Sequence, residues 1–101
     1  MRMLMHIHFP LEPFNTAVRD GSAGQKIKRI LEAIKPEAAY FSEQDGRRGG
    51  TLVVNANDPS EVPALAEPWF LTFAAQIEFR IAMTLEDLSR ANPDALGKKW
   101  A

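Results

Sequence analysis

Two histidines near the start of the chain, His6 and His8, are the only histidines in the sequence. Side chains two residues apart point to the same face of an extended strand, which places these imidazoles about 7 Å apart. Imidazole gains or loses a proton near neutral pH, so either ring can serve as a general acid or base. The pair also fits a metal site if Glu78 is a third ligand. The alternative is two neutral histidines on a partly hydrated sheet face.

Glu78 and Arg80 repeat the same spacing near the other end of the chain. A guanidinium can bind a carboxylate or stabilise an enolate, and a carboxylate or imidazole beside it can move a proton. One reaction that suits this set is proton abstraction next to a carbonyl, with His6 as the base and Arg80 stabilising the enolate. The alternative is an ion pair between Glu78 and Arg80, within the sheet or between subunits.

Two aromatic side chains, Tyr40 and Trp69, are candidates for ligand binding. The hydroxyl of Tyr40 can donate a hydrogen bond to a ligand oxygen, or lie at the rim of a subunit interface. Trp69 clusters with Phe70 and Phe73, and such a cluster either lines a pocket for an aromatic ligand or belongs to the core. The predicted site therefore has no resident metal or cofactor and consists of catalytic His6, Glu78 and Arg80 and ligand-binding His8, Tyr40 and Trp69.

Two other polar segments suggest no chemistry. The sequence GSAGQK at 21–26 has two residues between its glycines and an isoleucine after its lysine, so it is not a phosphate-binding P-loop. Two short basic pairs, Arg47-Arg48 and Lys98-Lys99, are most simply interpreted as solvated charge.

The composition describes one ordinary domain. The 101 residues are 46% hydrophobic and 25% charged, and the net charge of −1 argues against a nucleic-acid or anionic-membrane partner. The absence of cysteine excludes disulfides, thiol nucleophiles and thiolate-bound metals. No apolar run approaches the roughly 18 residues of a membrane span, and the first nine residues are too short for a signal peptide. We therefore expect a cytoplasmic protein.

Hydrophobic periodicity predicts strands and helices in alternation. We expect strands at 1–9, 38–44, 51–56 and 76–83, and helices at 22–35, from about 58–60, and from 84. Proline and glycine predict an irregular entry before residue 22, with room for one loose helical turn. Pro68 is expected to break or kink the middle helix and to leave 67–70 as a separate turn. The domain would span 1–91, with 92–101 as a loose tail.

This order of elements predicts an α+β, ferredoxin-like βαββαβ fold with one antiparallel sheet in the order 4-1-3-2. Asp45-Gly46 is a strong hairpin turn, which would set Glu43 opposite Arg48 and Tyr40 opposite Thr51, unless Gly49-Gly50 inserts a bulge. Both main helices should cover the face formed by Met3, Met5, Ile7, Phe41, Leu52, Val54, Ile77, Phe79 and Ile81. The other face would be formed by His6, His8, Tyr40, Ser42, Thr51, Val53, Asn55, Gln76, Glu78 and Arg80.

The layout over residues 1–90 resembles the dimeric α+β-barrel superfamily, which includes muconolactone isomerases, antibiotic-biosynthesis monooxygenases and stress-responsive barrel proteins. The segments FNTAVRDGSAGQKI, KPEAAYFSEQDGRRG, AEPWFLTFAA and MTLEDL resemble a family of uncharacterised bacterial proteins within it. The resemblance implies a homodimer whose sheets pack face to face. It transfers no catalytic residue, and both histidines lie on the first strand rather than on a helix, where haem-degrading relatives have theirs.

Three functional hypotheses follow. The first is a small-molecule-binding homodimer, either an isomerase-like or a monooxygenase-like enzyme that needs no cofactor, with its site between sheet and helices or between subunits. The second is a non-catalytic structural or sensing dimer whose sheet face only joins two copies. The third is a dimer that binds metal through His6 and His8. The sequence does not decide whether the protein is an enzyme.

Overall fold

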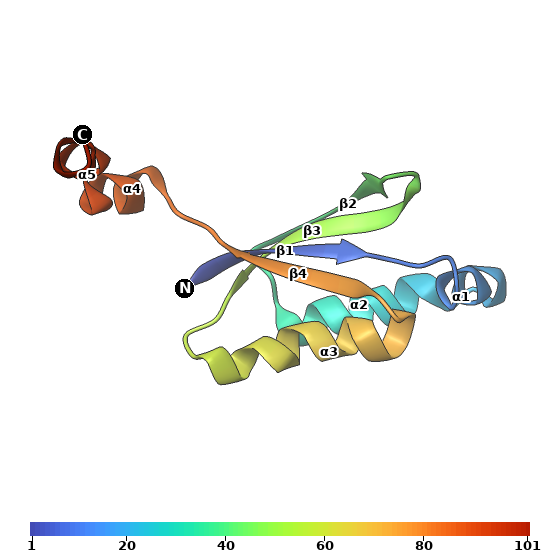
Figure 1. The fold of residues 1–101 in the computed structure, drawn as a ribbon. Helices are drawn as coiled ribbons and strands as arrows, with labels where there is room; N and C mark the ends of the chain where they lie inside the picture. The colour runs from blue at the N-terminus through green and yellow to red at the C-terminus, as the bar shows by residue number, and fades with distance from the viewer.

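The computed structural model describes residues 1–101 as one sheet with helices (Figure 1). In chain order the elements are β1 (Arg2–His8), α1 (Phe14–Asp20), α2 (Ala23–Ile34), β2 (Ala38–Gln44), β3 (Arg47–Asn55), a 3-10 turn (Pro59–Glu61), α3 (Val62–Phe73), β4 (Gln76–Ile81), α4 (Leu85–Ala91) and α5 (Pro93–Lys99).

The sheet has the order β2-β3-β1-β4 with every neighbouring pair antiparallel, which confirms the predicted ferredoxin-like arrangement. Figure 1 shows α2 and α3 side by side on one face of this sheet. We call this the helix side and the opposite surface the open face. Because directly paired residues share a face, the register assigns every strand side chain to one of these surfaces.

The β2–β3 hairpin has the predicted register. Asp45 and Gly46 both have positive φ, at 53° and 77°, as a two-residue hairpin turn of the primed type requires. The turn pairs Glu43 with Arg48 and Tyr40 with Thr51. The expected alternative of a bulge at Gly49-Gly50 is wrong, since β3 pairs without interruption through both glycines.

The hydrophobic core lies between the sheet and α1, α2 and α3. The largest fully buried side chains include Trp69 and Phe73 of α3 and Met5, Ile7 and Leu52 of the sheet. Two residues expected to be covered on the helix side are exposed instead, because the helices do not reach either end of the sheet: Phe41 is 46% exposed and Ile81 is 65% exposed.

Two helical predictions need correction. The segment expected to be an irregular entry contains a regular helix, α1, which ends at Gly21 in the left-handed conformation. Pro68 does not break the middle helix, since α3 continues from Val62 to Phe73. The carbonyl that loses its partner belongs to the exposed Ala64, where water can replace it, and the buried Trp69 anchors the helix after the proline.

The chain ends in two short helices, and the expectation of a loose tail is wrong. Thr84 and Asp87 form a capping box at the start of α4, where a helix was predicted to begin. Asn92 ends α4 in the left-handed conformation, and its side chain also accepts a hydrogen bond from the Ala95 N–H at the start of α5. Pro93 occupies the first helical position, where its missing N–H costs nothing.

We call residues 82–101 the C-terminal arm. Figure 1 shows it extending past the end of β4 and lying on the opposite side of the sheet from α2 and α3. The radius of gyration is 17.0 Å, whereas a compact chain of this length has about 13 Å. None of the helices is both long and apolar enough to span a membrane.

Candidate functional site

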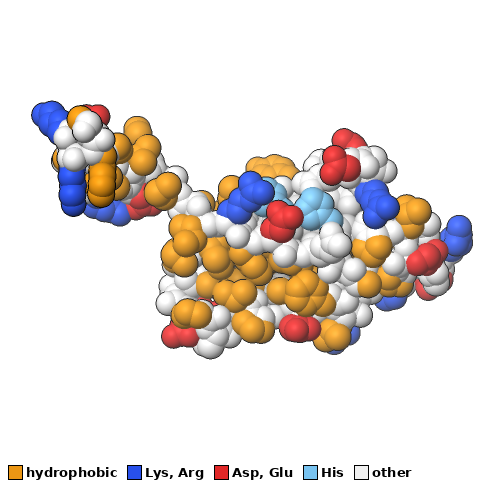
Figure 2. Space-filling model, in the orientation of Figure 1, with side chains coloured by type: hydrophobic (Ala, Val, Ile, Leu, Met, Phe, Trp, Pro, Cys, Tyr) orange, Lys and Arg blue, Asp and Glu red, His pale blue; other side chains and the backbone are white.

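The open face brings together five of the six residues predicted for the site. His6 is paired with Glu78 on one side and with Thr51 on the other, and Tyr40 continues the same row on β2. His8 and Arg80 belong to the adjacent rows. Figure 2 shows the two histidines beside basic and acidic side chains on the upper edge of the sheet.

The charged side chains of the open face contact one another. His8 Nε2 lies 3.8 Å from a carboxylate oxygen of Glu78, and Arg80 Nη2 lies 3.5 Å from the other oxygen. His6 Nδ1 is 3.2 Å from the hydroxyl oxygen of Thr51, which leaves its Nε2 without a partner in the chain. The ion-pair alternative for Glu78 and Arg80 therefore describes the observed contact, while one imidazole nitrogen remains available for proton transfer.

The metal-binding alternative has no geometric support. No group of three histidine, aspartate or glutamate side chains in the chain is placed to hold a metal ion. Of the proposed ligands, His8 and Glu78 approach each other, but the Nδ1 of His6 contacts Thr51 instead. His6, His8 and Glu78 therefore do not form a three-ligand cluster.

The two predicted aromatic ligand-binding residues lie on opposite surfaces. Tyr40 is 70% exposed on the open face, where a ligand or a second subunit can reach its ring. Trp69 is fully buried on the helix side, with the rings of Phe9 and Phe73 centred 5.9 Å and 6.4 Å away. Trp69 therefore belongs to the core, as its alternative interpretation expected, and does not join the other five residues.

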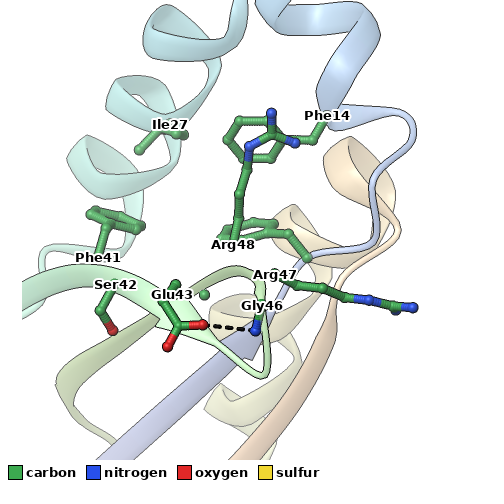
Figure 3. A pocket seen from close by; sticks show the side chains of 10 residues that line it. Phe14, Ile27, Phe41, Ser42, Glu43, Gly46, Arg47 and Arg48 are labelled. Carbon is green, nitrogen blue, oxygen red and sulfur yellow. Dashed lines mark hydrogen bonds between the residues drawn. The ribbon is translucent and has the colours of Figure 1, made fainter.

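A pocket of about 450 Å³ opens on the helix side, between α1, α2 and the β2–β3 hairpin (Figure 3). Its apolar lining consists of Phe9, Phe14, Ile27 and Phe41. Gly50 shapes it, because a Cβ there would lie 3.0 Å from the ring of Phe41. The absence of a side chain at Gly50 thus lets the ring of Phe41 lie close to β3.

Arg47 and Arg48 both border this pocket, and Arg48 is the one whose side chain turns into it. Its guanidinium carbon is 4.5 Å from the centre of the Phe14 ring, and its Nη1 donates a 2.7 Å hydrogen bond to Asn15 Oδ1. Stacking and this hydrogen bond fix the orientation of the planar group. A guanidinium has five N–H donors, and only this one has a partner in the chain. Figure 3 shows Arg48 turned toward Phe14 while the adjacent Arg47 points away.

No carboxylate is within ion-pair distance of Arg48, although two lie in its neighbourhood. Glu43, its cross-strand partner, accepts a 2.7 Å hydrogen bond from the Gly46 N–H and so stabilises the hairpin turn. Hydrogen bonds from Thr16 hold the pKa of Glu12 below its ordinary value, and the charges of Arg19 and Arg48 lower that pKa further. The pocket therefore combines an apolar lining with a guanidinium that has unused donors.

Sequence reasoning missed this pocket because it treated Arg47 and Arg48 as a pair of solvated charges. The strand alternation contained the necessary signal: Leu52 and Gly50 face the helix side, and Arg48 is the next residue in that series. The remaining lining depends on α1, which was expected to be irregular, and no pattern on the strands indicates where Phe14 and Asn15 lie.

An α+β sheet with this order and with two helices on one face defines the ferredoxin-like class. No protein-family model matches the chain, and no curated protein matches it in sequence. Among solved structures, it is similar to the 5-chloro-2-hydroxyhydroquinone dehydrochlorinase TftG from Burkholderia phenoliruptrix AC1100, solved in complex with 2,5-dihydroxybenzoquinone. The TM-score is 0.55 at 18% sequence identity, over 86% of this chain and 99% of that chain. This likeness supports the ferredoxin-like fold.

Proposed function

We propose that the protein is a homodimer that binds a small planar organic anion in the helix-side pocket, with Arg48 as the anchor. The supporting observation is a guanidinium held by Phe14 and Asn15 that has four N–H groups without a partner in the chain. A carboxylate, phenolate or enolate accepts two parallel hydrogen bonds from such a group. The rings of Phe14 and Phe41 would contact the apolar body of the ligand.

The likeness to TftG is in keeping with this class of ligand. That protein was solved with 2,5-dihydroxybenzoquinone, a planar ring that carries several oxygens. A ring of this size occupies much less than the 450 Å³ of the pocket described above, so both the ring and a polar substituent fit. The comparison supports the size and shape of the proposed ligand.

Calorimetric titration tests the proposal with benzoate and 2,5-dihydroxybenzoquinone as anionic probes and benzamide as a neutral analogue of benzoate. A hydrogen bond to a charged group is worth about 1.5–3 kcal/mol, so Arg48→Gln should weaken binding of the anions by about tenfold to a hundredfold. Arg47→Gln is the matched control, because its side chain points out of the pocket, and it should bind as the wild type does. Equal affinity of wild type and Arg48→Gln for benzoate would contradict the proposal.

The open face supports a second candidate, an isomerase-like activity at the subunit interface. The observation in its favour is the His6 ring, whose Nδ1 contacts Thr51 while its Nε2 has no hydrogen-bond partner in the chain. His6 would remove a proton next to a carbonyl, and Arg80 would stabilise the enolate. Deuterium exchange into α-angelica lactone, followed by NMR, tests this step, and an equal rate in wild type and His6→Ala would eliminate it.

The contacts of the open face also favour a non-catalytic alternative. Glu78 contacts both His8 and Arg80, so the charged groups partly satisfy one another without a ligand. In that case the open face joins two copies and performs no chemistry. The same exchange experiment decides between the two, since a non-catalytic face leaves the lactone protons at their uncatalysed rate.

A further inference from the structure

The C-terminal arm exposes apolar side chains that its own chain does not cover. Figure 2 shows them along both short helices and at the junction with the sheet. Leu85 at the start of α4 is 79% exposed, and Trp100, which directly follows α5, is 77% exposed. The others in the arm are Met83, Leu88 and Leu96, each at least 43% exposed, and Ile81 at the end of β4 adjoins them at 65% exposed.

The arm is nevertheless well formed, because its helices are capped. Thr84 and Asp87 exchange hydrogen bonds of 3.0 Å at the start of α4, and Asn92 caps α5. Helices of seven residues are unstable by themselves in water, so caps alone do not explain them. Their apolar residues recur at helical spacing, Leu85 with Leu88 and Leu96 with Trp100, which is the pattern of helices that pack against another surface.

The position of the arm indicates which surface that is. The arm lies on the open-face side of the sheet, beyond the end of β4. At this same end of the open face, Ala38, Val53 and Leu4 form one cross-strand row that ends at Arg80. The least polar row of the open face and the apolar residues of the arm are therefore neighbours, and a partner seated on the face also meets the arm.

The area of the open face makes the same point. Four strands about 4.8 Å apart, with seven residues at about 3.3 Å each, cover roughly 450 Å². A stable interface buries about 800 Å² on each partner. The exposed apolar side chains of the arm add to the surface that a second copy seated on the open face can bury.

We propose that the arm is exchanged between subunits: in the homodimer, α4 and α5 of each copy pack their apolar side chains against the other copy. This inference rests on the dimer of the proposed function and adds the element that stabilises it. Two-fold symmetry makes the contact reciprocal, so each subunit both gives and receives an arm. Exchange also accounts for a single chain measuring 59 × 29 × 19 Å.

The two tryptophans of the wild-type chain report on the exchange directly. Trp69 is fully buried within its own subunit, so acrylamide quenching above that background reports Trp100. Sedimentation velocity gives the dissociation constant, and quenching is then measured at concentrations on both sides of it. The proposal expects no quenchable fluorescence in the dimer and a quenchable component after dilution to monomers. A quenched Trp100 in the dimer overturns the exchange and leaves the dimer itself intact.

Point variants complete the test. Leu96→Ser and Trp100→Ser should each raise the dissociation constant at least tenfold, while Leu71→Ser, 82% exposed on α3, should leave it unchanged. Equal dissociation constants in these three variants overturn the proposal. A protein that is monomeric at every concentration, or a monomer whose Trp100 is protected by its own chain, also overturns it. The Arg48 titration reports on the ligand pocket in each of these cases, so failure of the arm and failure of the pocket are distinguishable.

Discussion

The two faces of the sheet are made by alternate residues of the same four strands, yet they differ in completeness. On the helix side, Met5, Ile7 and Leu52 are fully covered by the chain's own helices, and the end that carries Arg48 opens as a pocket. On the open face, Tyr40 and Arg80 remain exposed and the charged groups contact only one another. One face is therefore closed by folding, and we propose that the other is closed by association.

The largest effect on stability should come from substitutions in the core on the helix side. Trp69→Ala removes the largest buried side chain and should lower the free energy of unfolding by about 3–5 kcal/mol, measured by urea denaturation. Leu71→Ala, two residues away but exposed, should change it by less than about 0.5 kcal/mol. Trp69→Phe should cost less than Trp69→Ala, because the buried indole N–H has no hydrogen-bond partner to lose. Similar values for Trp69→Ala and Leu71→Ala would contradict this view of the core.

Alanine substitutions at two glycines, Gly50 and Gly24, test the close packing beneath Phe41. In Gly50→Ala the new Cβ meets the Phe41 ring at 3.0 Å and the Tyr40 carbonyl oxygen at 3.1 Å, so the strand or the ring must move. Overpacking of this kind costs about 1–3 kcal/mol, which urea denaturation can measure. Gly24→Ala in α2 meets nothing within 4 Å and should stabilise the protein by up to about 1 kcal/mol. Equal destabilisation by both would show that Gly50 does not shape the pocket.

Substitutions on the open face should change the dimer dissociation constant rather than the free energy of unfolding. Tyr40→Ala removes an exposed aromatic ring of the kind that contributes strongly to interfaces, and should raise the dimer dissociation constant at least tenfold in sedimentation equilibrium. Val18→Ala, on the exposed surface of α1, is the control and should have no effect. A change in the unfolding of Tyr40→Ala with unchanged association would reverse the assignment of the two faces.

The smallest effect concerns pH and the start of α4. Hydrogen bonds from the Thr84 backbone and side chain, together with Arg90, hold the pKa of Asp87 below its ordinary value. A lowered folded-state pKa stabilises α4 above the unfolded pKa of about 3.9, and this contribution is lost as the pH falls through the lower folded value. Carbon chemical shifts of α4 should report a loss of helix below about pH 4 in the wild type and no such acid step in Asp87→Asn. If Asp87→Asn loses helix at low pH as the wild type does, a group other than Asp87 causes that loss.

The sheet was predictable because its signals are local and repeated. Alternation along 1–9 and 76–83 assigned the faces, and Asp45-Gly46 fixed the hairpin register that pairs Glu43 with Arg48. The glycines at 49 and 50 were misjudged, since they leave room for the side chains of Gln44 and Phe41 and do not form a bulge. Whether a glycine makes space or interrupts a strand depends on cross-strand neighbours that its own sequence position does not reveal.

The helices and the pocket were less predictable because tertiary contacts decide them. Burial of Trp69 and Phe73 keeps α3 continuous through Pro68, and α5 starts at Asn92-Pro93, inside the segment that was expected to be a loose tail. The residues that share the open face, including His6, Glu78 and Arg80, could be predicted from their spacing along the strands alone. The pocket required α1, whose Phe14 and Asn15 orient Arg48, and strand alternation could assign the arginine to the helix side but not supply its partners.

An NMR titration of the labelled dimer with benzoate tests the central claim, that one face binds the ligand and the other binds the second copy. The account predicts shifts at the Ile27 methyls and the Arg48 guanidinium, which line the pocket, while the Leu4 and Val53 methyls on the open face remain unchanged. Shifts at Leu4 and Val53 with Ile27 and Arg48 unmoved would contradict it, and would place the ligand site between the sheets instead.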